Sequence, residues 1–292
     1  MKICIEKYPM GSLKGQKTAG RYIDGYLHEN LSILADAIVK DNTFLGFVSS
    51  STLEVGTGKS CFVQQLGEAW TELINKKHNQ NLEFNMRNVV FKPEHLIERA
   101  FKLPKYSCII LDEWDDATYW SQLGISLRQF FRKCRQLNLF MICICPNFFQ
   151  IPLGYSVSRS VFFIDVKFAD NFERGHFEFY SFKKKKDLYL KGKKNHDYNV
   201  TKSDFYGVFS DGYAVPEQEY RSAKLRDLAE SEKPKITERS ITINLFKQFK
   251  KNRPDISVET IASGFGITKR TGFRWLVDDF SEENEGVSDG NA

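Results

Sequence analysis

The sequence predicts an α/β protein with a mostly parallel sheet, followed by a small all-α domain. Short apolar runs with strand character alternate with segments of helical periodicity over much of the chain, a pattern typical of a parallel sheet covered on both faces. A polar stretch then precedes a second helical pattern near the C-terminus. A length of 292 residues is sufficient for one sizeable domain and one small one.

The individual elements follow from hydrophobic periodicity. Continuous apolar runs predict strands at 44–48, 89–91, 108–111, 139–145 and 161–166. Helices are predicted at 26–40, where leucine and isoleucine recur at helical spacing, and at 59–76, 94–103 and 121–136. Strict alternation in 176–182 and again in 187–191 predicts an antiparallel hairpin over 176–191, with lysines at its turn.

These elements suggest five segments. They are a flexible lead-in at 1–25, an α/β domain at 26–200, a polar linker at 201–235, a helical domain at 236–280 and a disordered acidic tail at 281–292. The net charge of +5 is modest, but seven lysines between 183 and 194 form a basic cluster that could attract phosphate groups.

Composition also bears on location. No apolar run reaches the roughly 18 residues that a membrane-spanning helix needs, and the first residues lack the apolar core of a secretion signal. We therefore expect no membrane insertion and a cytoplasmic protein, in the host cytoplasm if the chain is viral. Of the six cysteines, Cys108, Cys143 and Cys145 lie in apolar runs, which favours buried thiols over a metal site.

A glycine-rich turn between the strand at 44–48 and the helix from 59 carries the clearest chemical signal. Glycines at 56 and 58 would let backbone N–H groups wrap phosphates, Lys59 would reach the β- and γ-phosphates of a nucleotide, and the Ser60 hydroxyl would bind Mg²⁺. The full pattern G-x-x-x-x-G-K-[ST] asks for glycine where this chain has Leu53. The predicted nucleotide-binding residues are Gly56, Thr57, Gly58, Lys59, Ser60 and Cys61.

A second motif lies some fifty residues downstream, where the apolar run 108–111 ends in Asp112 and Glu113. In ATPases with this pair, the aspartate supports Mg²⁺ and the glutamate polarises the attacking water as a general base. We therefore predict that Asp112 and Ser60 are the metal residues, that Glu113 is the catalytic base, and that the cofactors are ATP and Mg²⁺.

Further catalytic candidates surround the strand 139–145. Asn147 follows this strand, where ATPases of the additional-strand type place a residue that senses the γ-phosphate, and Cys145 is the alternative. An arginine from a neighbouring subunit can stabilise the charge that develops in phosphoryl transfer. Among the arginines on either side of the strand, Arg135 and Arg159 are the leading candidates.

The order of these motifs resembles the FtsK–HerA superfamily of P-loop ATPases, and most closely its zonular-occludens-toxin-like phage members and mobile-element DNA-transfer or packaging ATPases. The resemblance covers roughly 40–170 and rests on VGTGKS, IILDEW, FFRKCRQLN and LFMICICPNF. A glutamine often follows the last strand in that family, whereas this chain has Pro146 and Asn147. The resemblance implies a RecA-like core, a homo-oligomeric ring that often has six subunits, and translocation of DNA.

Residues 257–276 resemble the helix-turn-helix of regulators and transposase-related proteins. A first helix around Val258–Ala262, a turn at Gly266 and a second helix capped by Thr268 are predicted. The second helix would offer Lys269, Arg270, Thr271 and Arg274 to DNA, which we expect to be double-stranded. The alternative is a helical hairpin that contacts another subunit.

Two functions fit these features. The first is an ATP-hydrolysing DNA-binding motor of a virus, plasmid or other mobile element, which translocates or packages DNA. The alternative is an AAA+-like ATP-dependent DNA-binding regulator or helicase loader. The sequence between 170 and 235, where AAA+ proteins carry a helical lid, shows no pattern of a separate lid with a sensor arginine, which favours the motor. The aspartate–glutamate pair and the helix-turn-helix pattern argue against a small-molecule kinase.

Overall fold

The computed structural model describes residues 4–6, 22–52, 56–114, 122–168, 174–231 and 238–277. The chain divides into two compact units, Met1–Leu228 and Ala229–Ala292. Among the described helices, none combines the length and the apolar character needed to cross a bilayer. The acidic tail predicted at 281–292 lies outside the described residues.

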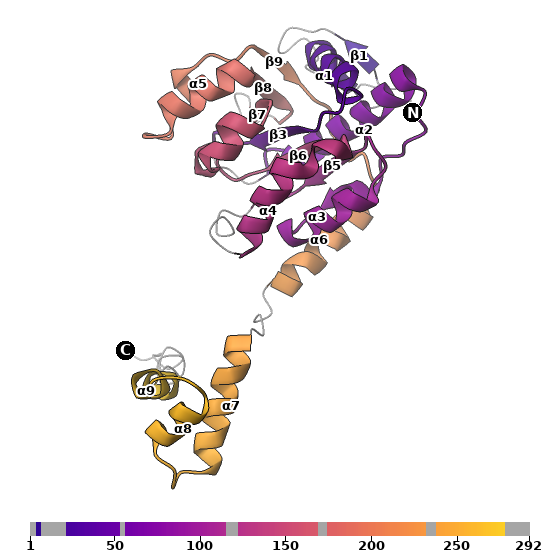
Figure 1. The fold of residues 1–292 in the computed structure, drawn as a ribbon. Helices are drawn as coiled ribbons and strands as arrows, with labels where there is room; N and C mark the ends of the chain where they lie inside the picture. The colour runs from indigo at the N-terminus through magenta and orange to yellow at the C-terminus, as the bar shows by residue number, and fades with distance from the viewer. Residues whose placement is uncertain are drawn as a thin grey trace, which may run out of the picture. The chain divides into compact units, whose positions relative to one another are not determined.

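The first unit is built on a mixed, mostly parallel sheet of seven described strands in the order β4-β5-β6-β3-β7-β8-β9 (Figure 1). The first five strands in this order are parallel, β8 is antiparallel to β7, and β9 is antiparallel to β8. The strands are β3 (Phe44–Ser49), β4 (Val89–Val90), β5 (Cys108–Leu111), β6 (Phe140–Ile144), β7 (Phe162–Lys167), β8 (His176–Ser181) and β9 (Phe205–Val208).

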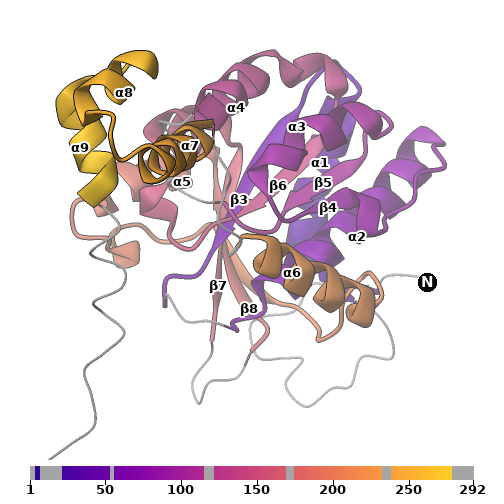
Figure 2. The same cartoon turned by 90° about the horizontal axis from the view of Figure 1, so that it is seen from below.

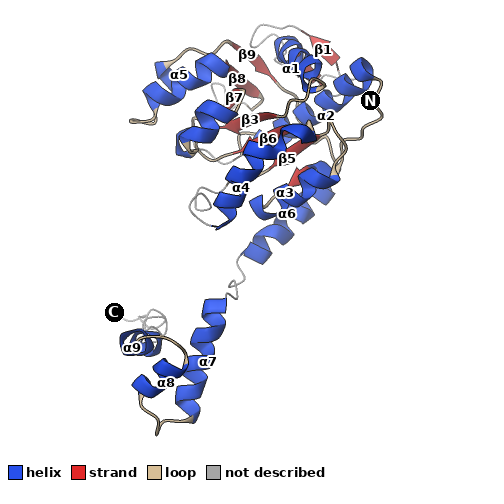
Figure 3. Cartoon of the chain, viewed as in Figure 1, coloured by secondary structure: helices blue, strands red, loops and turns tan. Residues whose placement is uncertain are grey.

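Helices cover both faces of this sheet, as the apolar strands require. Helices α1 (Gly25–Ile38) and α2 (Lys59–His78) pack on one face, whereas α3 (Pro93–Lys102), α4 (Gln122–Lys133) and α5 (Phe182–Gly192) pack on the other (Figure 3). Side chains of a strand alternate between the two cores, so that Phe47 joins one and Val48 the other. The predicted α/β class with a mostly parallel sheet is therefore confirmed.

Short helical turns make several connections. They are η1 (Met86–Asn88), η3 (Cys134–Leu137), η4 (Phe148–Gln150), η5 (Gly154–Arg159) and η7 (Tyr198–Val200). The cysteines follow the predicted pattern: Cys108, Cys143 and Cys145 are buried free thiols within the two cores. Burial raises the pKa of Cys143 well above its usual value, as expected for a thiol that contributes only to packing.

The predicted lead-in ends earlier than residue 25. A short strand, β1 (Cys4–Glu6), pairs in parallel with β2 (Tyr22–Asp24), whose three residues are buried. Asp24 caps α1 by accepting hydrogen bonds from the backbone N–H groups of Tyr26 and Leu27. Residues 7–21 lie outside the described part of the chain.

The predicted hairpin at 176–191 is wrong in its second half. Residues 176–181 form β8, but the lysine-rich segment that follows is the helix α5. The alternation in 187–191 was misleading because the neighbours Leu188 and Tyr189 are both buried, as in a helix, while Leu190 is about half exposed. One lysine of the basic cluster is also buried: Lys185 donates to the backbone carbonyls of Ser156 and Val157 in η5.

The region predicted as a linker, 201–235, contains regular structure over much of its length. Strand β9 completes the sheet, and α6 (Glu217–Ser231) follows it. Helix α6 lies beside the end of β4 and the start of α3 (Figure 2), where Lys92 pairs with Asp227 at 3.2 Å. Its sequence is polar almost all round, so its periodicity could not distinguish it from a linker. The boundary between the two units falls inside this helix.

The second unit contains three described helices, α7 (Glu238–Asn252), α8 (Val258–Gly264) and α9 (Lys269–Val277). Their core is small and includes Phe246, Ile261, Ala262 and Trp275. Gly266 turns the chain between α8 and α9 with φ of +67°, a conformation that favours glycine. Three large apolar side chains of this unit are exposed: Leu245, Phe249 and Phe273.

Candidate functional site

The turn between β3 and α2, called here the glycine loop (50–58), lies at the carboxyl end of the central strand. Gly56 and Gly58 have φ values of +90° and +95°, which residues other than glycine rarely adopt. Lys59 begins α2, and its half-buried ammonium group lies 3.4 Å from the Thr57 hydroxyl. Backbone N–H groups at a helix start beside a lysine form an environment suited to anions. Residues 53–55, including Leu53, lie outside the described residues.

Asp112 follows β5 at the same edge of the sheet. Its backbone N–H donates to the carbonyl of Val90 and so continues the pairing of β4 with β5. The carboxylate is buried, with 1% of the side chain exposed, and it accepts hydrogen bonds from Tyr220 and Lys224, each at 2.7 Å. Glu113 is exposed beside it. The two adjacent carboxylates therefore lie in different environments.

The structure brings two of the predicted metal residues together. The Tyr220 hydroxyl donates to Oδ2 of Asp112, and the Ser60 side chain lies close enough to this hydroxyl to act on its pKa in the lowering direction. Burial raises the pKa of Tyr220, and the charge of Asp112 adds to this effect, so the hydroxyl keeps its proton. Ser60 and Asp112, predicted from separate motifs, therefore approach one point from α2 and β5.

Positive charge surrounds this point. Burial is the main factor that lowers the pKa of the Lys59 ammonium group, and the charge of Lys224 adds to it. The nearby acidic groups of Cys145, Asp165 and Asp112 act in the opposite direction. A phosphate group placed at the glycine loop would meet Lys59, whereas Lys224 is held by Asp112 and repels Lys59.

Asp165 is a site residue that sequence reasoning missed. It lies near the end of β7, opposite Ser49 of β3, and is fully buried. One carboxylate oxygen accepts a 2.7 Å hydrogen bond from the backbone N–H of Ser51, and the other lies 3.4 Å from Lys167. Asp165 therefore anchors the start of the glycine loop. A charged residue inside the apolar run VFFIDV was the available signal.

Arg174 is a second missed residue. Its guanidinium group lies beside the glycine loop, 3.4 Å from the position that a Cβ atom on Gly56 would occupy. Arg174 is exposed and directly precedes Gly175, which has φ of +98°. This arrangement adds a third cation to the anion-binding environment around Lys59. Nothing in the local sequence distinguished this arginine from a solvated one.

Asn147, the predicted sensor, has local partners at the end of β6. Its side-chain oxygen accepts from the backbone N–H of Phe149 and from the Tyr198 hydroxyl, and its amide nitrogen lies 3.1 Å from His196. The structure therefore gives Asn147 a capping role for η4. The alternative, Cys145, is buried and its thiol lies 3.6 Å from the carbonyl of Val48.

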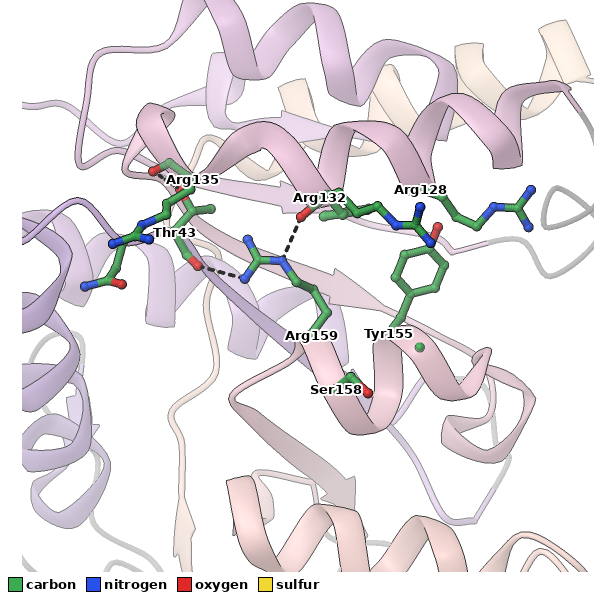
Figure 4. Close-up of a pocket in the computed structure, with 10 residues that line it drawn as sticks. Thr43, Arg128, Arg132, Arg135, Tyr155, Ser158 and Arg159 are labelled. Atoms are coloured by element: carbon green, nitrogen blue, oxygen red, sulfur yellow. Dashed lines mark hydrogen bonds between the residues drawn. The ribbon is translucent and has the colours of Figure 1, made fainter.

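The two predicted catalytic arginines lie at the opposite edge of the sheet, where the parallel strands begin. With Arg128 and Arg132 they line a cavity of about 590 Å³ (Figure 4). Arg159 points toward α4 and donates to the carbonyls of Phe131 and Thr43, whereas Arg135 donates to the carbonyl of Asp41. Neither arginine is placed at the glycine loop of its own chain.

The predicted DNA-binding residues lie on one helix of the second unit. Lys269, Arg270 and Arg274 are exposed on α9, and Lys269 pairs with Glu259 of α8 at 2.6 Å. Thr271 donates its backbone N–H to the Thr268 hydroxyl, so the predicted cap of α9 is present. Gly272 allows close packing, because a Cβ there would lie 3.0 Å from the ring of Phe246.

No known protein family, curated protein or solved structure matches this chain. The function must therefore be argued from the site itself. Among the described residues, no cluster of three or more histidine, cysteine, aspartate or glutamate side chains could hold a metal. Mg²⁺ does not require such a cluster, since it commonly binds one or two protein oxygens together with substrate phosphates and water.

The buried Asp165 generates a pH-dependent prediction. Burial raises the pKa of Asp165 from 3.8 to about 6, against the opposing effects of Lys167 and the Ser51 hydrogen bond. A raised pKa means that the charged carboxylate destabilises the fold above pH 6 and that this cost disappears as the pH falls toward 4. Asp165→Asn should therefore be more stable than the wild type at pH 7.5, by up to about 3 kcal/mol at ~1.4 kcal/mol per pKa unit.

Denaturant unfolding at pH 7.5 and pH 4.5 measures this difference. The gain should shrink at the lower pH, whereas Asp211→Asn, at an exposed position, should show no such trend. A variant that is equally destabilised at both pH values would show that the carboxylate contributes favourable contacts that outweigh its burial.

Proposed function

We propose that this protein binds ATP with Mg²⁺ at the glycine loop and hydrolyses it, and that it uses this activity as a DNA-binding motor of a mobile element. The observation that carries the ATPase proposal is the convergence of Ser60 and Asp112 on Tyr220, directly beside Lys59. The two motifs, some fifty residues apart in the sequence, thus lie at the same edge of the sheet, on either side of Tyr220.

The side chains of Ser60 and Asp112 fit a hydrated divalent cation. Asp112 is a buried carboxylate whose neighbouring cation, Lys224, occupies a position where positive charge is favourable. Ser60 and Asp112 would hold Mg²⁺, which would neutralise phosphate charge during hydrolysis. Lys59 and the N–H groups of the glycine loop would bind the phosphates, and Arg174 lies close enough to that loop to assist.

Glu113 suits the role of general base because it is exposed next to a buried neighbour. A base must reach water at the site, and a carboxylate that is paired and buried, as Asp112 is, cannot do so easily. The sheet order agrees with this assignment: β6 lies between β3 and β5, so the strand that bears Glu113 is one strand removed from the glycine loop. This is the arrangement that gives the additional-strand ATPases their name.

The motor part of the proposal rests on the motif resemblance to the FtsK–HerA superfamily and on the second unit. The three helices of that unit, with a glycine turn and an exposed basic face on α9, suit a helix-turn-helix that binds double-stranded DNA. We propose that the ATPase acts as a homo-oligomer, since its candidate catalytic arginines have no place at their own glycine loop.

The alternative, an AAA+-like regulator or helicase loader, is favoured by one observation. The region 170–235, which was expected to hold no helical lid, contains α5 and α6. Helix α6 brings the cation Lys224 to the predicted metal site, which is the kind of task a lid residue would perform. The two functions differ in one observable respect. DNA should stimulate continuous hydrolysis by the motor, whereas ATP binding alone should control assembly of the regulator.

The first functional prediction concerns the phosphate site. Lys59→Ala should abolish binding of a fluorescent ATP analogue, because the phosphates lose a direct cationic partner, whereas Glu113→Gln should retain binding and reduce turnover by about 100-fold or more. Binding titrations and phosphate release measure the two effects separately. Lys76→Ala, an exposed lysine later in α2, is the matched control. Normal hydrolysis by Lys59→Ala would remove the ATPase proposal.

The arginine cavity provides a second prediction. If Arg135 or Arg159 acts on the nucleotide of a neighbouring subunit, a mixture of that alanine variant with Glu113→Gln should recover some hydrolysis that neither protein shows alone. Arg159→Ala should also lower stability, because the part-buried carbonyls of Phe131 and Thr43 would no longer have this donor. Arg135→Ala should lower it less, since the Asp41 carbonyl that Arg135 binds is exposed to water. Lys133→Ala, at an exposed position of α4 outside the cavity, should keep the activity of the wild type. Full activity of a dilute monomer is incompatible with this scheme.

The third prediction concerns DNA. Changing Lys269, Arg270 and Arg274 together to alanine should weaken binding to duplex DNA, and it should lower the slope of affinity against salt by about 0.9 for each phosphate that these side chains neutralise. The matched control removes three charges from another part of the same unit, namely Lys247, Lys251 and Arg253. Fluorescence anisotropy at several salt concentrations measures both. If both triple variants bind DNA as the wild type does, the lysine-rich helix α5 becomes the better candidate for the DNA-binding site.

A further inference from the structure

Helix α6 reaches the predicted metal site through two neighbouring side chains. Tyr220 and Lys224 are four residues apart, so they project from the same face of the helix. Both donate to the same atom, Oδ2 of Asp112, at 2.7 Å. Since only 1% of the Asp112 side chain is exposed, any cation that approaches this oxygen must displace one of these donors.

We propose that Lys224 and Mg²⁺ compete for Asp112, so that α6 is a strap whose hold on the ATPase unit is weakened when metal and nucleotide bind. This inference rests on the proposed ATPase function. It adds a residue that determines metal affinity and a segment that responds to the state of the site.

Electrostatics sets the direction of the competition. The ammonium group of Lys224 neutralises the buried carboxylate of Asp112. It also lies close enough to Lys59 to lower the pKa of the Lys59 ammonium group. A divalent cation bound to Asp112 would take over the neutralisation and repel the ammonium group. Lys224 is about one-third exposed, so its side chain can move toward solvent without a large rearrangement.

The rest of α6 is weakly anchored. Among its side chains whose burial is described, Tyr220 is the only buried one, and Leu225 is 66% exposed. Tyr220 packs on the ring of Phe91 at 5.5 Å and belongs to a small cluster with Val89 and Val215. Besides this cluster, the contacts of α6 with the sheet and α3 include the ion pair between Lys92 and Asp227. Release of Lys224 from Asp112 would therefore remove one of the described attachments of α6 to the sheet.

The position of α6 in the chain gives the competition a consequence. The boundary between the two units lies between Leu228 and Ala229, within this helix. A change in how firmly residues 217–228 are held would therefore occur next to the point where the first unit ends.

The test compares full-length wild type with Lys224→Met, which keeps the length of the side chain and removes its charge. The first readout is the Mg²⁺ concentration at half-maximal binding of a fluorescent non-hydrolysable ATP analogue. Lys224→Met should lower this concentration by about fivefold, the factor that corresponds to ~1 kcal/mol for a partly exposed ion pair. Arg226→Met, on the same helix and exposed, should leave it unchanged.

The second readout is hydrogen exchange of the α6 amides. In the wild type, Mg²⁺ with the analogue should speed exchange in 217–228, and in Lys224→Met exchange should already be fast without metal. Tyr220→Phe keeps the buried ring and removes the hydroxyl that donates to Asp112, so it should shift both readouts in the same direction. This variant replaces Lys224→Met in the test if Lys224→Met does not fold. An unchanged metal midpoint in a folded Lys224→Met variant, or slower exchange of α6 with metal and nucleotide, would overturn the strap.

The wild-type protein distinguishes failure of the strap from failure of the ATPase proposal. A wild type that binds no ATP analogue at any Mg²⁺ concentration overturns the proposed function and the strap with it. A wild type that binds the analogue normally, with a metal midpoint that does not depend on Lys224, overturns the strap and leaves the ATPase proposal standing.

Discussion

The sheet of the first unit is buried on both faces, and this constraint organises the rest of the molecule. A strand with apolar cores on either side cannot carry polar side chains in its middle, so these collect where strands end. At the carboxyl edge, Ser49, Asp112 and Asp165 follow this rule, and the glycine loop and α2 begin beside them. The concentration of charge that suits a phosphate site is thus a by-product of burying the sheet, and it agrees with where ligands bind in open α/β sheets.

The opposite edge of the sheet has its own chemistry. Four arginines around one cavity give this edge a positive character of its own, separate from the cations Lys59, Lys224 and Arg174 near the glycine loop. If these arginines act on the nucleotide of another copy, as we propose, the copies would associate head to tail, with the amino edge of one against the carboxyl edge of the next. Such heterologous contacts close into rings when the rotation between subunits permits it. The ring expected from the motif resemblance would be a natural outcome of this polarity.

Much of the sheet could be predicted from the sequence, because a strand buried on both faces is a continuous apolar run. The five parallel strands lie within one or two residues of their predicted positions. Helix α5 was misread because Leu188 and Leu190 alternate with more polar residues over a short stretch, and only the buried pair Leu188 and Tyr189 shows its helical period. Helix α6 was missed since it has almost no apolar face. Its contact with Asp112 spans 112 residues, and no local pattern carries such information.

The late strand β9 and helix α6 change how this protein should be dissected. A fragment that ends near residue 200, where composition suggests a domain boundary, would leave β8 as an unpaired edge strand, and such edges promote aggregation. The same cut would strip both donors from the buried carboxylate of Asp112. An insoluble fragment would then reflect the site of the cut and not a property of the first unit. The smallest fragment that keeps the complete sheet and both donors to Asp112 extends through α6.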